Sequence, residues 1–386
     1  MNDKKLKTDD KKNVMKLGWV SFFTDVSSEM IFPILPLFLT TVLKANMAVV
    51  GLIEGIAEST AAILKLFSGL LSDRIKKRKL LVFIGYGLST FTKPLLAVAT
   101  TWTHVLGVRF FDRVGKGVRT SPRDALIAAS VTEKERGKYF GIHRALDTSG
   151  AIVGTLIAAL LLYLFVNNYR LIFWLSLVPG LIALLIILKV KEVKVEKSKN
   201  MKFNFKALNP NLKMFLIAVI VFNLAHFSYA FFILRARDVG LSLTLIPVIY
   251  LVYNLFYAGF AIQAGKMSDR IGRKNVLTAG YMLFGITSFG FAFIANDMTI
   301  WLLFALYGLF MAITDGVSRA YVSDLSKDHE RGISLGTYHM IVGIAVLPAN
   351  LIGGALWNYV NVAAPFVYAT VLSIISAVLL IILVKK

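Results

Sequence analysis

Residues 265–274 of the chain read GKMSDRIGRK, and a similar segment, GLLSDRIKKRK, occupies residues 69–79. A second pair of segments recurs at nearly the same spacing of about 195 positions: ERGKYFG at residues 135–141 and ERGISLG at residues 330–336. Two unrelated motifs that recur at one spacing indicate an internal duplication. The sequence therefore predicts a protein built from two similar halves.

Long apolar segments separate these charged motifs. Of the 386 residues, 57% are hydrophobic and 17% are charged, which is too apolar for an ordinary soluble protein. About 20 apolar residues cross a bilayer core about 30 Å thick. The twelve predicted spans cover residues 15–42, 48–71, 80–100, 103–128, 139–166, 171–189, 214–235, 243–265, 276–295, 298–324, 333–357 and 364–384. The expected fold is an all-α integral membrane protein with six spans in each half.

The connections between these spans are alternately rich and poor in basic residues. Thirty of the 43 Lys and Arg residues lie at the two termini or after even-numbered spans, and four lie after odd-numbered spans. Because cytoplasmic loops are enriched in basic residues, we predict a multi-pass cell-membrane protein with both termini in the cytoplasm. The first apolar run contains Asp25 and Glu29 and lacks a small-residue cleavage site, so we interpret it as a span rather than a signal peptide.

The connection after the sixth span is the only long polar segment between spans. It covers residues 189–213 and contains eight lysines, which we expect to lie against anionic lipid and not to bind nucleic acid. The predicted domains are thus a six-helix bundle at residues 1–188, a basic cytoplasmic linker at 189–213 and a second six-helix bundle at 214–386.

The repeated loop motif resembles the signature G-x-x-x-D-R-x-G-R-[KR] of the major facilitator superfamily. The C-terminal copy matches it at Gly265, Asp269, Arg270, Gly272, Arg273 and Lys274, whereas the N-terminal copy has Lys76 in place of the inner glycine and one additional residue. DRVGKGVRTSPRDAL, residues 112–126, is similar to a largely uncharacterised branch of that superfamily. The resemblance implies a transporter with two pseudo-symmetric six-helix bundles.

A carboxylate near a helix end can accept hydrogen bonds from backbone N–H groups and pair with arginine. We therefore expect a cytoplasmic gate that latches the halves in one state and releases them in the other. Alternatively, the basic residues of the motif only set the orientation of the chain in the membrane, but this leaves the repeated aspartate unexplained. The predicted gate residues are Gly69, Asp73, Arg74, Arg123, Asp124, Gly265, Asp269, Arg270 and Arg273.

Seven charges lie within residues 109–124, RFFDRVGKGVRTSPRD, inside the fourth predicted span. At about 100° per residue they share one stripe of a helix. An unpaired charge facing lipid costs at least about 2.5 kcal/mol, so the stripe needs water, partners or a ligand. Arginine binds carboxylate or phosphate with two hydrogen bonds, and the excess of basic residues therefore favours an anionic or zwitterionic substrate.

Acidic residues also occur inside spans. Asp25 and Glu29 share a face of the first span, and a carboxylate in a poorly hydrated cavity can change protonation near neutral pH. Permanent ion pairs with the arginines of the fourth span are the alternative. The candidate substrate or proton-coupling residues are Asp25, Glu29, Arg109, Asp112, Arg113, Lys116, Asp315 and Arg319. A candidate pocket contains Asn223, His226, Tyr250, Asn254 and Tyr257, for which ordinary helix contacts are an equal alternative.

The function predicted from these residues is secondary active transport of a small solute by alternating access, coupled to protons. An efflux carrier for amphipathic drugs or lipids is the alternative, although the glycine series of drug antiporters is retained only at Gly141, Gly150 and Gly154. A membrane-embedded enzyme finds no metal-ligand cluster, nucleophile elbow or phosphate loop in the sequence. The expected partners are the solute, protons and membrane lipids, and we expect a monomer without cofactor or metal.

Overall fold

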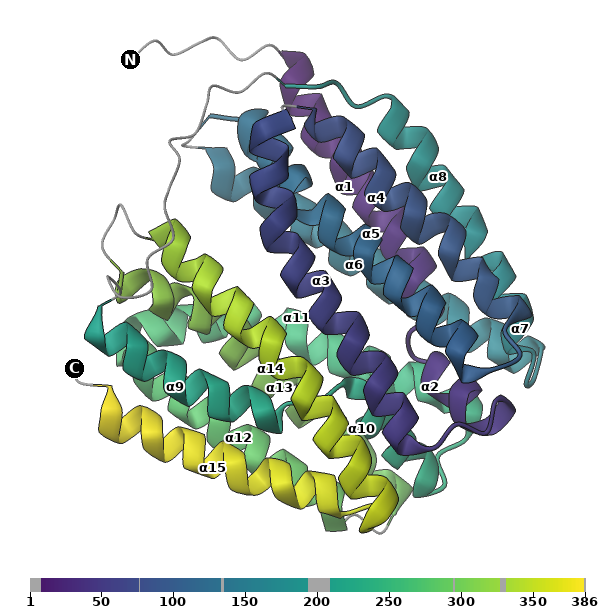
Figure 1. Ribbon diagram of the computed structural model, residues 1–386, viewed down its shortest axis with the longest axis vertical. Helices are drawn as coiled ribbons and strands as arrows, with labels where there is room; N and C mark the ends of the chain where they lie inside the picture. The colour runs from purple at the N-terminus through teal and green to yellow at the C-terminus, as the bar shows by residue number, and fades with distance from the viewer. Residues whose placement is uncertain are drawn as a thin grey trace. The chain divides into compact units, whose positions relative to one another are not determined.

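The computed structural model describes residues 8–75, 77–132, 135–193, 209–293, 296–326 and 331–384, and their regular secondary structure is helical throughout (Figure 1). The first half of the chain forms α1 (Thr8–Glu29), α2 (Leu35–Leu37), the π-helix η1 (Phe38–Val42), α3 (Met47–Ile75), α4 (Arg78–Thr92), the 3-10 helix η2 (Lys93–Val98), α5 (Trp102–Ala129), α6 (Arg136–Leu164), α7 (Tyr169–Leu175) and α8 (Leu177–Leu188).

The second half repeats this pattern of long helices. It forms α9 (Pro210–Ala225), α10 (Tyr229–Asp238), the 3-10 helix η5 (Leu243–Leu245), α11 (Ile246–Ile271), α12 (Arg273–Phe293), α13 (Asp297–Asp324), α14 (Arg331–Tyr359) and α15 (Ala364–Leu383). Each of the twelve predicted spans corresponds to one helix or to two or three consecutive helices, so the all-α prediction with twelve spans is confirmed.

Ten helical segments in the described part of the chain are long and apolar enough to cross a membrane. The two remaining spans, α1 and α5, are 22 and 28 residues long but carry more charged side chains. Most of the predicted linker, residues 194–208, lies outside the described residues, as does the side chain of Asp73. The predicted domain boundary within residues 189–213 therefore stays a prediction.

Contacts divide the chain into two compact units. Unit 1 comprises Met1–Phe38 and Thr60–Lys199, and unit 2 comprises Leu39–Ser59 and Asn200–Lys386. The first half of α3 thus belongs to the unit formed mainly by the second half of the sequence. The Ser59 hydroxyl donates a 2.7 Å hydrogen bond to the Gly343 carbonyl of α14, and a Cβ added at Gly55 would lie 2.9 Å from Leu347.

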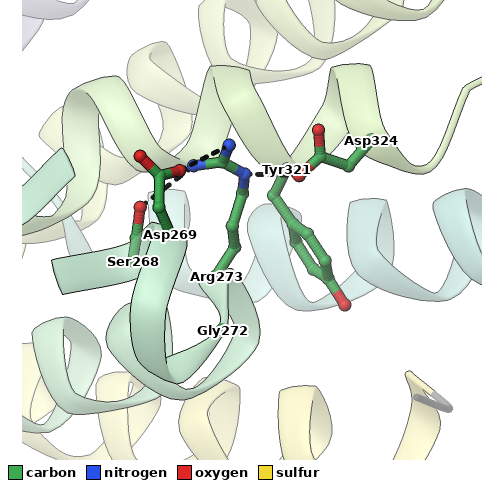
Figure 2. A pocket seen from close by; sticks show the side chains of 6 residues that line it. All are labelled: Ser268, Asp269, Gly272, Arg273, Tyr321 and Asp324. Atoms are coloured by element: carbon green, nitrogen blue, oxygen red, sulfur yellow. Dashed lines mark hydrogen bonds and ion pairs between the residues drawn. The ribbon is translucent and has the colours of Figure 1, made fainter. Parts of the chain in front are cut away.

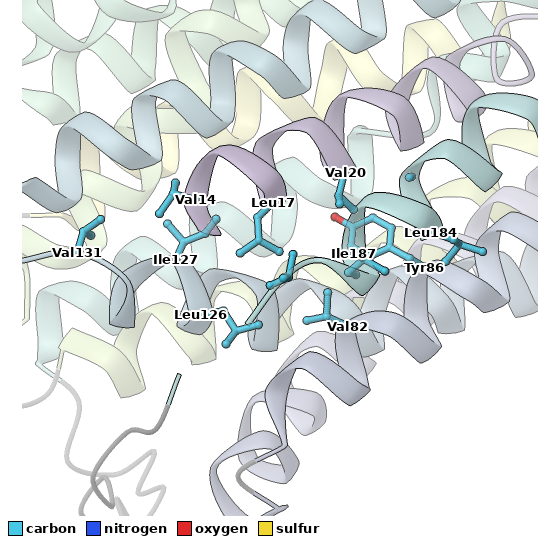
Figure 3. Close-up of a cluster of buried hydrophobic side chains, with 12 residues drawn as sticks. Val14, Leu17, Val20, Val82, Tyr86, Leu126, Ile127, Val131, Leu184 and Ile187 are labelled. Atoms are coloured by element: carbon cyan, nitrogen blue, oxygen red, sulfur yellow. The ribbon is translucent and has the colours of Figure 1, made fainter. Parts of the chain in front are cut away.

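Unit 1 has an apolar core between four helices, drawn in Figure 3. In this unit α1 packs against α6 and α8, and α4 packs against α5. The buried side chains include Val14, Leu17 and Val20 of α1, Val82 and Tyr86 of α4, Leu126 and Ile127 of α5, and Leu184 and Ile187 of α8. In unit 2, α9 packs against α14 and α15, and α11 packs against α13.

The first and seventh spans are interrupted at corresponding points of the repeat. Between α1 and α2 the chain contains Pro33, which lacks the N–H needed to continue the helix. Between α9 and α10 it turns at residues 226–228, and the Ser228 side chain accepts a hydrogen bond from the Ala230 N–H of the new helix. Met30 and His226 directly follow the first helix of each pair and are separated by about one repeat length.

Candidate functional site

The charged stripe on α5 lies largely inside unit 1. Arg109, Asp112 and Arg113 are at most 4% exposed, and Arg119 is 7% exposed, whereas Lys116 is exposed. The guanidinium carbons of Arg109 and Arg113 lie 5.0 and 4.7 Å from the centroid of the Phe32 ring, a distance suited to cation–π attraction. The break in the first span, which contains Phe32, therefore packs against the cationic stripe.

Side chains of α4 and η2 lie beside the end of this stripe that contains Arg119. Arg119 donates a 2.5 Å hydrogen bond to the Ser89 hydroxyl, and its guanidinium lies 4.4 Å from the centroid of the Tyr86 ring. Lys93, which is 2% exposed, donates to the hydroxyls of Ser27 and Ser28 at 2.7 and 3.1 Å. The ammonium group of Lys93 is thus a buried part of this charged region, which the sequence analysis does not include among the candidate residues.

The carboxylate of Asp147 on α6 contacts α1 beside the stripe. Ser21, one turn before Asp25 on α1, donates a 2.5 Å hydrogen bond to Asp147 Oδ1 on α6. Arg123 forms an ion pair of 2.9 Å with Asp124 and also approaches Ser21 Oγ at 3.5 Å. Arg123 and Asp124, predicted to take part in the gate, are therefore also neighbours of the Asp25 region.

In unit 2 the break in the seventh span is lined by aromatic rings. The His226 ring lies 5.9 Å from Phe222, 5.3 Å from Phe284 and 5.4 Å from Phe310, centroid to centroid. Its Nε2 is 3.3 Å from the Tyr307 hydroxyl. The imidazole is therefore held between apolar rings and one hydroxyl group.

Tyrosines of α11 continue from this cluster. Tyr253 stacks on Tyr250, Tyr257 and Tyr307 with ring centroids 5.5, 6.3 and 5.0 Å apart. The Tyr257 hydroxyl donates a 2.6 Å hydrogen bond to Asp315 Oδ2, and the same oxygen accepts a 2.6 Å hydrogen bond from Arg319. The structure thus connects two predicted sets, the pocket residues of α11 and the Asp315–Arg319 pair of α13.

The two predicted asparagines make local hydrogen bonds. The side-chain amide of Asn223 donates to the Val219 carbonyl at 2.8 Å, and that of Asn254 donates to the Tyr250 carbonyl at 3.2 Å. Each amide group therefore bonds to the backbone of its own helix.

A carboxylate from α3 reaches the start of α10 within unit 2. Glu54, which is 1% exposed, accepts a 3.2 Å hydrogen bond from the Ser228 hydroxyl, and the Ser228 N–H donates to the Asn350 side chain at 2.9 Å. An acidic side chain is favourable at a helix N-terminus because the helix dipole is positive there. Hydropathy and spacing alone do not reveal this contact, since its three residues come from three separate spans.

The C-terminal copy of the loop motif forms a charged cluster, shown in Figure 2. Arg273 pairs with Asp269 at 3.0 Å, with Asp324 at the end of α13, and donates to the Ser268 hydroxyl at 3.0 Å. These residues line a hollow of about 270 Å³ together with Gly272 and Tyr321. The structure therefore brings two predicted gate residues, Asp269 and Arg273, together with Asp324.

The N-terminal copy makes matching local bonds. Ser72 donates to the Gly69 carbonyl at 2.9 Å, as Ser268 does to the Gly265 carbonyl at 2.7 Å. Lys79 Nζ donates to the Leu188 carbonyl at the end of α8 at 2.9 Å. In the second copy, Lys274 Nζ donates to the carbonyls of Ile381 and Val384 at the end of α15, at 2.9 and 2.6 Å. The duplication seen in the sequence is therefore repeated in the hydrogen bonds.

Twelve membrane-spanning segments, a duplicated half and charged side chains buried inside the spans define a multi-pass membrane transporter. The sequence model of the Major Facilitator Superfamily matches residues 17–234 and 214–386. The chain belongs to this superfamily, which confirms the resemblance found in its loop motif and makes it a transporter rather than an enzyme.

Comparison with individual proteins agrees with this assignment. The chain is 41% identical to an uncharacterized MFS-type transporter of Methanocaldococcus jannaschii, over 98% of this chain and 96% of that protein. It is 24% identical to the cis,cis-muconate transport protein of Acinetobacter baylyi, over 78% and 77% of the two chains. A crystal structure of a mutant of the nucleoside transporter NupG aligns with a TM-score of 0.81, covering 97% of this chain and 100% of that one. At 15% identity, that likeness shows the fold alone.

Proposed function

We propose that the protein is a proton-coupled secondary transporter of a small organic anion, which works by alternating access across the cell membrane with both termini in the cytoplasm. The observation that carries the anionic substrate class is the charge buried in unit 1. Among the described residues of that unit, four Lys or Arg side chains and one acidic side chain are buried, namely Lys93, Arg109, Arg113, Arg119 and Asp112. The buried charge of this region is therefore predominantly positive, which attracts an anionic solute.

The interrupted helices support a solute site at the level of the breaks. Transporter sites are commonly built at discontinuous spans that occupy corresponding positions of the two repeats. In unit 1 the break places Phe32 against Arg109 and Arg113, and in unit 2 it places His226 against Tyr307. Both breaks therefore lie beside residues predicted as candidates for binding.

The similarity to a cis,cis-muconate transport protein also favours an organic anion, because that relative's named solute is a carboxylate. Guanidinium groups bind carboxylates through paired hydrogen bonds, which suits the arginines of α5. The proton-coupling part of the proposal depends on the half-buried carboxyl groups of α1, Asp25 and Glu29.

The proposal is tested with the full chain in proteoliposomes, by measuring uptake of labelled cis,cis-muconate with and without a pH gradient. We expect uptake that depends on the gradient and loses that dependence in Asp25→Asn, while Asp238→Asn serves as a control in an exposed ion pair at the end of α10. Equal uptake with and without the gradient would show that proton coupling is wrong. Movement of an amphipathic cation, with no movement of muconate or other small anions, would instead favour the efflux function.

A further inference from the structure

The buried lysine of η2 lies at the end of the first helix. Lys93 is the first residue of η2, and the chain changes from an α-helix to a 3-10 helix here because Pro94 lacks a backbone N–H. The Lys93 ammonium group donates to the hydroxyls of Ser27 and Ser28 at 2.7 and 3.1 Å. Both serines belong to the last turn of α1, where the negative end of the helix dipole favours a cation. Lys93 therefore binds the third span to the end of α1.

A hydrogen bond continues from Lys93 to the sixth span. The Ser27 hydroxyl has a single hydrogen, which it donates to the Ser176 carbonyl at 2.7 Å, so its oxygen is the acceptor for Lys93. Ser176 lies between α7 and α8, where the sixth span is interrupted. The same span also binds the other end of η2, because Arg170 of α7 donates to the Ala97 carbonyl at 2.5 Å. The interruptions of the first, third and sixth spans are therefore joined through one buried ammonium group.

The contact with Ser28 leads to the cationic stripe of α5. The Ser28 carbonyl accepts a 3.0 Å hydrogen bond from the Phe32 N–H, which forms part of the turn after α1. The Phe32 ring lies over the guanidinium groups of Arg109 and Arg113. Ser28 is thus bound by Lys93 through its side chain and by Phe32 through its backbone. The position of the ring therefore depends on Lys93, which holds Ser28.

The duplicated half has a different residue at the position of this lysine. At the repeat spacing of about 195 positions, Lys93 corresponds to Ser288 or Phe289. Both lie within α12, which continues as an α-helix to Phe293. The two halves share the loop motif, whereas Lys93 belongs to the half that contains the buried arginines. This difference links Lys93 to the anion site rather than to the gate.

We propose that Lys93 is a positioning residue of the anion site: its ammonium group fixes the break in the first span, and with it the Phe32 ring over the arginines of α5. The inference deepens the proposed function and rests on it for its role in transport. Attraction to the ring holds the guanidinium groups of Arg109 and Arg113 in place, which reduces the cost of ordering them when a carboxylate binds. Release of Ser28 from Lys93 frees the ring to move, and the affinity for the anion falls although every positive charge is retained.

Two serine variants test the break in the purified full chain without any substrate. Ser28→Ala removes an acceptor of Lys93, whereas the control Ser130→Ala removes another buried hydroxyl, which bonds to its own helix at the Leu126 carbonyl. The chain contains no cysteine, so Met30→Cys introduces a single thiol, directly after α1 at a side chain that is 3% exposed. We expect N-ethylmaleimide to label this thiol about tenfold faster in Ser28→Ala, because a hydrogen bond to a charged group is lost, and at an unchanged rate in Ser130→Ala. An unchanged rate in Ser28→Ala, or equal acceleration in both variants, would overturn the inference.

Lys93→Met tests the ammonium group itself, since methionine nearly keeps the length of the side chain but has no donor. Labelling of Met30→Cys should accelerate at least as much as in Ser28→Ala, whereas the exposed Lys266→Met should leave it unchanged. Addition of Ser28→Ala to Lys93→Met should cause no further acceleration, because both changes remove the same hydrogen bond. Accelerations that multiply in the double variant would contradict the inference. If Lys93→Met does not fold, the serine variants decide alone.

Transport in proteoliposomes connects the break to the anion. Ser28→Ala should raise the KM of cis,cis-muconate uptake about tenfold and leave the maximal rate unchanged, because binding is weakened while the charges remain. Faster labelling with an unchanged KM would overturn the role of Lys93 in the anion site. If labelling behaves as expected but the wild type moves neither muconate nor other small anions, Lys93 still fixes the break and the proposed function fails. If the wild type moves muconate and Ser28→Ala behaves like the wild type in both assays, the proposed function stands and the inference about Lys93 fails.

Discussion

Replacement of Gly115 by alanine tests the close packing of α4 on α5 that places Arg119. A Cβ at this position would lie 2.5 Å from the Gly85 carbonyl oxygen and 2.8 Å from the Ser89 hydroxyl, whereas ordinary contact begins at 3.4 Å. The helices must therefore separate by roughly 1 Å, and overpacking of this kind costs about 1–3 kcal/mol. Alanine also favours the helix over glycine by about 1 kcal/mol, so the net change for Gly115→Ala is a loss of up to about 2 kcal/mol.

Gly107 provides the matched control on the same helix, because a Cβ added there meets no atom within 4 Å. We expect Gly107→Ala to be more stable than Gly115→Ala by about 1–3 kcal/mol, because it gains the same helix propensity without the overpacking. The assay is unfolding of the two purified variants in detergent, followed by tryptophan fluorescence. Equal stability of the two variants would refute the packing of α4 on α5 described here, and with it the position of Arg119 beside Ser89.

Three further substitutions test separate contacts in unfolding experiments. Lys274→Met should cost about 0.3–1 kcal/mol, because the ammonium group binds the last carbonyls of α15, and the exposed Lys266→Met should cost less; equal losses would contradict a role in capping. Tyr257→Phe removes the 2.6 Å hydrogen bond to Asp315, which should reduce the free energy of unfolding by about 1 kcal/mol. The loss should be smaller in an Asp315→Asn background. If the losses of the two single variants simply add in the double variant, the bond contributes nothing. Glu54→Gln should destabilise by about 1 kcal/mol, since a neutral amide interacts less favourably with Ser228 and the N-terminus of α10, and unchanged stability would refute this contribution.

The number of spans follows directly from the sequence, because membrane crossing depends on the mean hydropathy of long runs and tolerates a few charges. Even α1 and α5, with their charged residues, are recognised by the apolar residues around them. The two breaks are harder to predict. Pro33 marks the first, but residues 226–228 read HFS and contain neither proline nor glycine, so the second depends on tertiary contacts of Ser228 with Glu54 and Asn350.

The candidate site shows the same limit. A helical wheel places Arg109, Asp112 and Arg113 on one stripe, yet it does not show that Phe32 of another span covers two of them. Asp315 and Arg319 form the ion pair that their spacing allows, since both partners lie on one helix. Ser21 and Asp147 meet only because α1 and α6 are neighbours in space, and spacing within one helix cannot predict such a pair.

The division of α3 between the two units has a consequence for separating the halves of the protein. The helix is continuous from Met47 to Ile75, but its contacts change from one unit to the other between Ser59 and Thr60. Bonds such as that between Ser59 and Gly343 therefore hold the first half of α3 in unit 2, although its sequence lies in the predicted N-terminal bundle. A cut within the basic linker would thus leave an N-terminal fragment that carries residues 39–59 of unit 2 and a C-terminal fragment that lacks them.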